Sequence, residues 1–162
     1  FLAVGVPRLY NQQDMRLSYV VWDEGVSPAV IVELLSPGTE KEDLGQTDAK
    51  AGKPPTKWGV YEQILKVPHY ILYDRYSDVL KAYQLVNDQY QSLKIEAERV
   101  WIPNLNMGLG LWQGEYKGIT RKWLRWLDTE RNWIPTPLEQ SEGKASRLAE
   151  KLRALGIDPD TI

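Results

Sequence analysis

Residues 28–38 read Pro-Ala-Val-Ile-Val-Glu-Leu-Leu-Ser-Pro-Gly, the most apolar run of the chain, with a single glutamate, Glu33, inside it. Five of the six neighbours of Glu33 within residues 29–35 are β-branched or leucine, and turn-forming residues bound the run on both sides. A short, unbroken apolar run between such breakers predicts a strand that is buried on both faces. We therefore expect this strand to be central in a sheet.

Glu33 is unusual in such a strand because desolvating an ionised carboxylate costs several kcal/mol unless a cation or good hydrogen bonds compensate. A glutamate at this position is therefore expected to have a partner. One interpretation is a buried salt bridge or a carboxylate at the end of the strand. The other is a metal-binding or catalytic carboxylate, and the residues of the run leave both open.

The composition narrows the class of protein. A chain of 162 residues, 43% hydrophobic and 26% charged, fits one globular domain with a sizeable core and leaves room for an appendage. It contains no cysteine, which excludes disulfides, thiolate nucleophiles and cysteine-based metal sites within it and is compatible with the cytoplasmic location that we expect. A net charge of −2 argues against a protein that coats nucleic acid by bulk electrostatics, although a local basic groove is still possible.

Apolar alternation and turn residues predict a mixed α/β (α+β) domain. The expected strands span residues 1–6, 17–22, 29–35 and 69–73, with a hairpin at 79–85 and 90–95 and a further pair at 105–111 and 114–116. A long polar segment covers residues 36–56, and a loop of that length is often functional or mobile. The chain begins abruptly inside an expected strand, so we expect further residues upstream of Phe1.

Two helices are expected. The first spans about residues 56–65, with Thr56 as its N-cap. The second is an amphipathic helix with apolar residues at helical spacing from Ala145 to Leu155, ending at Gly156. Pro135 and Pro137 mark a boundary before it, so the expected organisation is a domain over residues 1–134 and a C-terminal helical extension over residues 135–162.

Lys57 falls near the middle of the apolar arc of the first helix, roughly in line with Tyr61 and Ile64. A cation in the first turn is also disfavoured by the helix dipole. Lys57 could simply extend from the helix start into solvent. Alternatively, it lies near a buried carboxylate, where it could stabilise developing negative charge or position water. Together with Glu33, this second arrangement would supply carboxylate ligands for a metal and an adjacent lysine, the equipment for hydrolysing a phosphodiester.

The chain resembles the Uma family of predicted endonucleases, which is greatly expanded in cyanobacteria. Residues 27–39, Ser-Pro-Ala-Val-Ile-Val-Glu-Leu-Leu-Ser-Pro-Gly-Thr, are similar to the family signature PDLVVEVLSPST. Further similarities lie in Glu42-Asp43-Leu44, in Lys57 placed before Val60-Tyr61, in residues 67–74 (compare GVPEYWLVD), in residues 22–25 and in the closing segment from Leu148 to Pro159. The resemblance covers essentially the whole chain.

This resemblance implies the PD-(D/E)XK, restriction-endonuclease-like fold, in which a mixed sheet carries acidic residues and a lysine around Mg²⁺ or Mn²⁺. Glu33 matches the acidic position, and the backbone carbonyl of Leu34 would be a second metal ligand. Leu35 stands where the motif has lysine, and Lys57 on the following helix is the matching residue. The first aspartate of the motif is expected upstream of Phe1. Ala29 replaces a non-catalytic aspartate of many members.

The resemblance implies a nuclease acting on nucleic acid, most simply DNA, with Glu33 as metal ligand and Lys57 as catalytic lysine. The alternative is an interaction module that keeps the fold without the activity, which the near-neutral charge favours. The apolar stripe of the C-terminal helix and the Trp-rich strands lead us to expect a homodimer, and nothing suggests a membrane.

We expect a structural role for His69, the only histidine. The cations and rings of residues 121–126 could be a nucleic-acid surface or a solvated face over the core.

Overall fold

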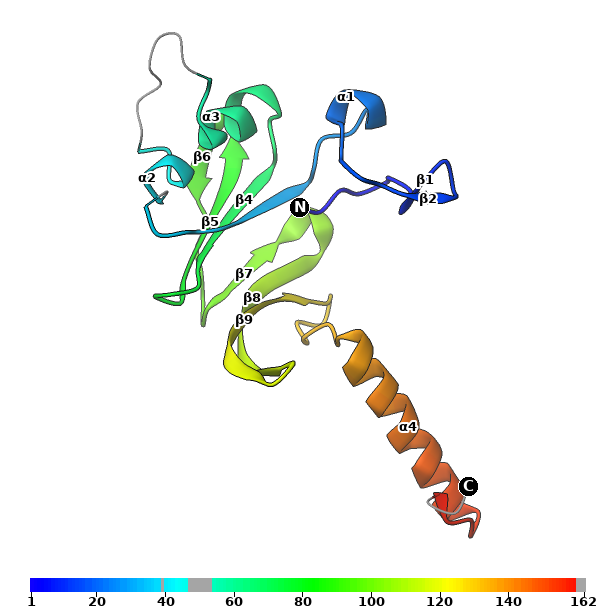
Figure 1. The fold of residues 1–162 in the computed structure, drawn as a ribbon. Helices are drawn as coiled ribbons and strands as arrows, with labels where there is room; N and C mark the ends of the chain where they lie inside the picture. The colour runs from blue at the N-terminus through cyan, green and yellow to red at the C-terminus, as the bar shows by residue number, and fades with distance from the viewer. Residues whose placement is uncertain (39, 47–53, 160–162) are drawn as a thin grey trace.

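The computed structural model describes residues 1–38, 40–46 and 54–159 and shows a mixed α+β fold consistent with the restriction-endonuclease-like class (Figure 1). The described residues form three sheets. A two-stranded sheet contains β1 (Leu9–Tyr10) and β2 (Asp14–Met15), and a four-stranded sheet contains β3 (Val30–Leu34), β4 (His69–Asp74), β5 (Val79–Val86) and β6 (Gln89–Ser92). A three-stranded sheet contains β7 (Arg99–Ile102), β8 (Met107–Tyr116) and β9 (Ile119–Leu127). The helical segments are α1 (Val21–Glu24), α2 (Glu40–Asp43), α3 (Lys57–Gly59), the π-helix η1 (Val60–Ile64), the 3₁₀ turn η2 (Pro103–Leu105) and α4 (Pro137–Ala154).

The four-stranded sheet has the order β3-β4-β5-β6, with β3 parallel to β4 and the remaining pairs antiparallel. The apolar run thus forms a strand as predicted, but β3 lies at the edge of this sheet and not at its centre. Only the start of β3 is covered on its other side, where Leu2 forms a single bridge to Val30. Val30 and Ile31 are buried accordingly, whereas the side chain of Leu34 is 57% exposed.

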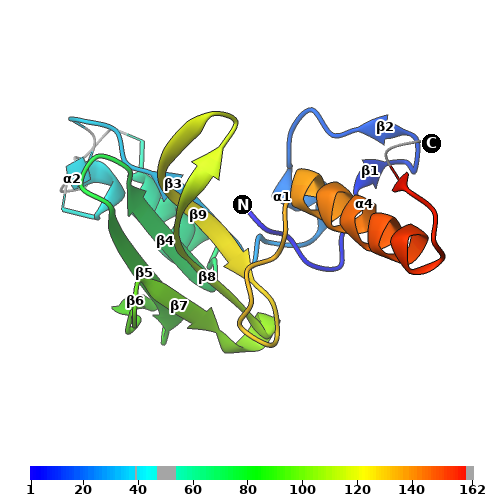
Figure 2. The same cartoon turned by 90° about the horizontal axis from the view of Figure 1, so that it is seen from below.

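The two faces of the four-stranded sheet pack against different layers, because successive side chains of a strand point in opposite directions. One face meets the antiparallel sheet β7-β8-β9 in a core that includes Val30, Ile71, Ala82, Ile102 and Leu109. Figure 2 shows these sheets as adjacent layers. This packing forms one hydrophobic core from segments that lie far apart in the chain.

The other face of the four-stranded sheet is covered by α2, α3 and η1. Trp58 on α3 makes edge-to-face contacts with Tyr70, Tyr83 and Tyr90, with ring centroids 4.9–5.6 Å apart. Such contacts stabilise aromatic clusters beyond the area they bury. Gly45 lies so close to Trp58 that a Cβ atom there would be 2.7 Å from the indole ring, so the segment after α2 is packed tightly against this cluster.

The helix predicted over residues 56–65 is present, but it changes type after one turn. Thr56 is its N-cap, as predicted, and accepts a hydrogen bond from the Gly59 backbone amide. From Val60 onward the segment is a π-helix, closed by the Leu65 amide donating to the Val60 carbonyl. The wider turn shifts the positions of later side chains. Ile64, which was predicted to lie on the apolar side of the helix, is therefore 63% exposed.

Other departures from the prediction involve the ends of the sheets. Residues 1–6 make only the Leu2 bridge, and the strand predicted at residues 17–22 is replaced by α1. Two strands were predicted within residues 105–116, but β8 runs without a break because β9 pairs along its whole length. The long polar segment 36–56 contains α2; its residues 39 and 47–53 lie outside the described part of the chain.

The C-terminal helix α4 begins at Pro137, earlier than the apolar spacing predicted, because Thr136 and Glu139 form a capping box. It has no buried residue and extends away from the sheets (Figure 1). No helix in the described ranges is both long enough and apolar enough to span a membrane.

Ile71→Ala should lower the free energy of unfolding by about 2–5 kcal/mol, because Ile71 is fully buried between the two sheets. Ile64→Ala removes the same atoms from an exposed position and should change it by less than about 1 kcal/mol. Urea denaturation followed by tryptophan fluorescence measures both. Equal losses in the two variants would contradict the packing described here.

Candidate active site

Glu33 lies on the face of β3 that is covered by the helical layer. Alternation places it on the same side as Ile31 and Leu35, which belong to the aromatic-rich core beneath α3. The parallel register sets Glu33 beside Leu72 of β4, which is fully buried. The Glu33 side chain itself is 22% exposed, so its carboxylate is partly desolvated and still reachable from solvent.

Lys57 provides the cation that the position of Glu33 requires. It is the first residue of α3, directly after the Thr56 N-cap, and its Nζ lies 3.4 Å from Oε2 of Glu33. The same Nζ lies 3.0 Å from Oδ1 of Asp43. Of the two interpretations of Lys57, the structure shows the one that places its amine near Glu33, and it adds a second carboxylate to the pair.

Asp43 is the site residue that the sequence did not reveal as one. It is the last residue of α2, and its side chain is 2% exposed. Its backbone carbonyl accepts a hydrogen bond of 3.2 Å from the Tyr70 hydroxyl, which joins α2 to β4. The only signal was the presence of Asp43 within the Glu42-Asp43-Leu44 similarity, because a short polar helix has no periodicity from which burial could be inferred.

Tyr61 completes the set of direct partners of Glu33. Its hydroxyl donates a 2.8 Å hydrogen bond to Oε1 of Glu33, on the opposite carboxylate oxygen from Lys57. Burial, reinforced by the hydrogen bond to Glu33 and the charge of that carboxylate, raises the pKa of Tyr61 to about 12. Tyr61 therefore remains a hydrogen-bond donor at neutral pH and holds the Glu33 carboxylate in one orientation.

The electrostatics of the cluster are set by two carboxylates around one ammonium group. The hydrogen bond from Lys57 to Asp43 raises the pKa of Lys57 above its ordinary value of 10.5; partial burial opposes this, and the charge of Glu33 adds to it. Lys57 is consequently positively charged at neutral pH. An arrangement of this kind can bind a cation between its carboxylates and can hold an anionic group against its lysine.

The side chains of the other residues singled out in the sequence, Leu34 and His69, do not take part in this cluster. Leu34 follows Glu33, and its side chain points to the opposite face of β3. His69 is 1% exposed on the face of β4 opposite Leu72, with Nδ1 3.4 Å from the Ala29 carbonyl oxygen. Burial lowers the pKa of His69, so it is neutral, and these contacts fit the structural role predicted for it.

The basic and aromatic segment 121–126 is divided between the two faces of β9. Leu124 and Trp126 pack on the core between the sheets. Arg125 lies on the other face, where its guanidinium is 4.5 Å from the centre of the Trp112 ring and makes two hydrogen bonds to Glu139. Arg125 therefore anchors α4, and the segment is not one continuous cationic surface.

Comparison with known proteins was made on the whole chain. No curated protein and no solved structure matches it. A family model named Uma2, with the description "Putative restriction endonuclease", matches residues 7–117, which include β3, the whole Glu33–Asp43–Lys57 cluster and Tyr61. The match spans more than half of the chain, and this chain therefore belongs to the Uma2 family.

Proposed function

We propose that this protein is a metal-dependent nuclease that hydrolyses phosphodiester bonds in nucleic acid, most simply DNA. The observation that carries the proposal is the position of the Lys57 amine, within 3.4 Å of Glu33 and 3.0 Å of Asp43. Two partly or fully desolvated carboxylates that converge on one cation are the core of a site for a hard metal ion beside a lysine. The Uma2 membership supports the same reaction class.

The described residues contain no group of three or more His, Cys, Asp or Glu side chains that could hold a metal, so a divalent ion here would be bound by two carboxylates and a backbone oxygen. Glu33 and Asp43 would be the carboxylate ligands, and the Leu34 carbonyl, next in the chain to Glu33, would be the third oxygen donor. Oxygen donors of this kind suit Mg²⁺ or Mn²⁺. When bound, such an ion lowers the pKa of coordinated water and neutralises charge on the phosphate. The ammonium of Lys57 lies beside both carboxylates, so the electrostatic potential at this position favours a positive charge.

The protonated state of Lys57 assigns it an electrostatic role. A lysine whose pKa is raised cannot take a proton from water at neutral pH, so Lys57 would bind the phosphate oxygens and stabilise their developing charge. Tyr61 would act as a positioning residue, because it contacts Glu33 and keeps that carboxylate oriented.

The alternative function is a non-catalytic interaction module with the same fold. The near-neutral charge of the chain favours it, since a protein with a net charge of −2 has no bulk attraction for nucleic acid. Fold alone cannot distinguish the two, because function lies in the site. We favour the nuclease because the Uma2 match includes the whole cluster, and the cluster combines two carboxylates and a lysine, the groups that the proposed reaction would use.

Glu33→Gln, Asp43→Asn and Lys57→Met should each lower cleavage by about 100-fold or more, because each removes a group that contacts the metal or the phosphate. The measurement uses linear, circular and single-stranded DNA with Mg²⁺ or Mn²⁺. Lys66→Met is the matched control, since Lys66 forms an exposed pair with Asp88 outside the site.

Calorimetry with Mn²⁺ should show binding to the parent protein and weaker binding to Glu33→Gln. Absence of both cleavage and metal binding in the parent protein would favour the interaction module.

Lys57 should also give a characteristic pH dependence of stability. Because its pKa is raised in the folded protein, its contribution is fully present below the unfolded value of 10.5 and is lost as the pH rises through the folded pKa. The difference in unfolding free energy between the parent and Lys57→Gln should therefore be constant from pH 7 to about 10 and shrink above it. Urea denaturation across this range measures it, with Lys66→Gln as control. A difference that grew with pH would contradict the ion pairs.

A further inference from the structure

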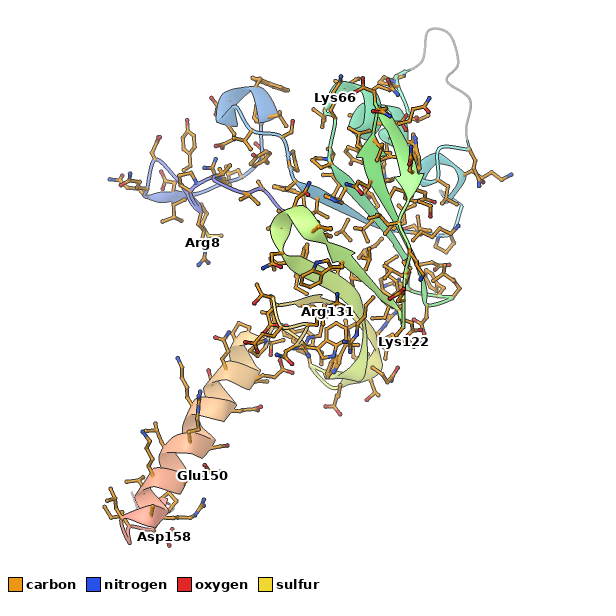
Figure 3. The ribbon with its side chains drawn as sticks, turned by 180° about the vertical axis from the view of Figure 1, so that it is seen from behind. Arg8, Lys66, Lys122, Arg131, Glu150 and Asp158 are labelled. Carbon is orange, nitrogen blue, oxygen red and sulfur yellow. The ribbon has the colours of Figure 1, made fainter. Side chains whose placement is uncertain are left out.

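The helix α4 leaves an apolar stripe without a partner in the described part of the chain. At about 100° per residue, the stripe occupies an arc of roughly 100°. Its members are Leu138, Ala145, Leu148, Leu152 and Leu155, and three of them, Leu138, Leu148 and Leu155, are 62–75% exposed. In Figure 3, Glu150 lies in the distal part of this helix and Asp158 in the segment after it, both far from Lys122 on β9 and from Arg131 in the loop that follows β9.

Among the residues that the structure describes, the hydrogen bonds that hold the helix to the sheets lie near its beginning. Arg125 holds Glu139 through two hydrogen bonds of 3.0 and 2.7 Å, and Glu139 in turn caps the helix start at Thr136. Beyond this turn, α4 continues for about 20 Å. Most of the stability of a helix in a protein comes from packing of its apolar face, and Gly143 in the interior of α4 lowers the intrinsic helix propensity. The extended helix therefore needs a surface to cover its stripe.

A pocket of about 620 Å³ opens beside the first turns of α4. Its walls are the β8–β9 hairpin and the helix start, and the rings of Trp112, Trp123 and Tyr116 line it. Three carboxylates, those of Glu115, Glu139 and Glu142, and two cations, Lys117 and Arg125, also line it. Because Arg125 is paired with Glu139, the pocket keeps a small excess of negative charge from Glu115 and Glu142 over Lys117. Most of the residues that line the pocket come after residue 117, where the Uma2 match ends. The pocket therefore lies mostly outside the part of the chain that matches the family.

The distal part of α4 has the opposite character to this pocket. Residues 143–155 contain four cations, Lys144, Arg147, Lys151 and Arg153, against the single carboxylate of Glu150. Apolar and cationic side chains are what a pocket of indole rings and carboxylates would bind. The stripe and the pocket are therefore complementary in both polarity and charge, but they lie at opposite ends of the same helix and cannot meet within one chain.

We propose that the partner is a second copy of this chain, whose α4 runs antiparallel to the first and places its distal half over the pocket at the first helix's base. Each copy then fills the other's pocket, as the two-fold symmetry of an isologous dimer requires. The pairing brings Arg153 of one copy towards Glu142 of the other. A parallel pair would set the two cation-rich halves side by side and leave both pockets uncovered. The inference is independent of the nuclease proposal.

The absence of cysteine from the chain allows a direct test of this orientation. Light scattering on the full chain should show a dimer. Pairing of Arg153 with Glu142 centres the two-fold axis between residues 147 and 148. Under mild oxidation, Leu148→Cys, which is on the stripe at this position, should therefore form a disulfide with its own copy, whereas Leu155→Cys, at the tip, should not. Glu150→Cys, on the face opposite the stripe, is the control and should not cross-link. A monomer in light scattering, or cross-linking of Leu155→Cys with itself, would overturn the antiparallel pairing.

A charge exchange tests the pocket itself. Glu142→Arg and Arg153→Glu should each raise the dimer dissociation constant by about tenfold, because each sets like charges against one another across the pair. The double variant should restore most of the affinity. Sedimentation equilibrium measures all three, and circular dichroism checks that α4 is still formed. A double variant weaker than either single variant would show that the two residues do not meet.

Discussion

The convergence of Glu33 and Asp43 on the Lys57 ammonium is the interaction on which the organisation of the site depends. Three segments that are distant in sequence, β3, α2 and the start of α3, meet at this one nitrogen. Asp43 is almost completely buried, so removing the lysine would take away an ion pair from a desolvated carboxylate, which is costly. The site is therefore also a structural joint between the sheet and the helices above it.

The change from α3 to the π-helix η1 sets the positions of the side chains that contact Glu33 from the helical layer. Lys57 and Tyr61 lie four residues apart and reach different oxygens of the same carboxylate. The wider turn then brings Leu65 into the aromatic-rich core and turns Ile64 outward. Single π-turns often occur at functional sites because their geometry is less favourable than that of an α-helix and is kept where it serves a purpose. Here it allows one short segment to contact both the carboxylate and the core.

The remainder of the chain divides into a supporting layer and an extension. The antiparallel sheet β7-β8-β9 buries the face of the four-stranded sheet that is opposite the site and so holds β3 and β4 in place. The same β8–β9 hairpin continues past this core and, through Arg125, fixes the direction of α4. The site and the C-terminal helix are thus connected through a rigid sheet, although they lie on different parts of the molecule.

The sequence alone determined the elements whose signals are local. The apolar run around Glu33, the Thr56 cap, the β5–β6 hairpin and the amphipathic α4 were predictable because periodicity, caps and turn residues act over a few neighbouring positions. The inward position of Lys57 could also be predicted, from its place on the helix arc. The similarity to the Uma family rested on the same residues.

Only the tertiary structure decided the features that depend on contacts between distant segments. The edge position of β3 follows from strand order, and the unbroken course of β8 follows from pairing with β9. The burial of Asp43 depends on how α2 packs over Tyr70. A carboxylate in a short polar segment has the same local sequence whether it is exposed or buried. Its environment is set by the packing of the sheet and helices around it, and no local pattern encodes that packing.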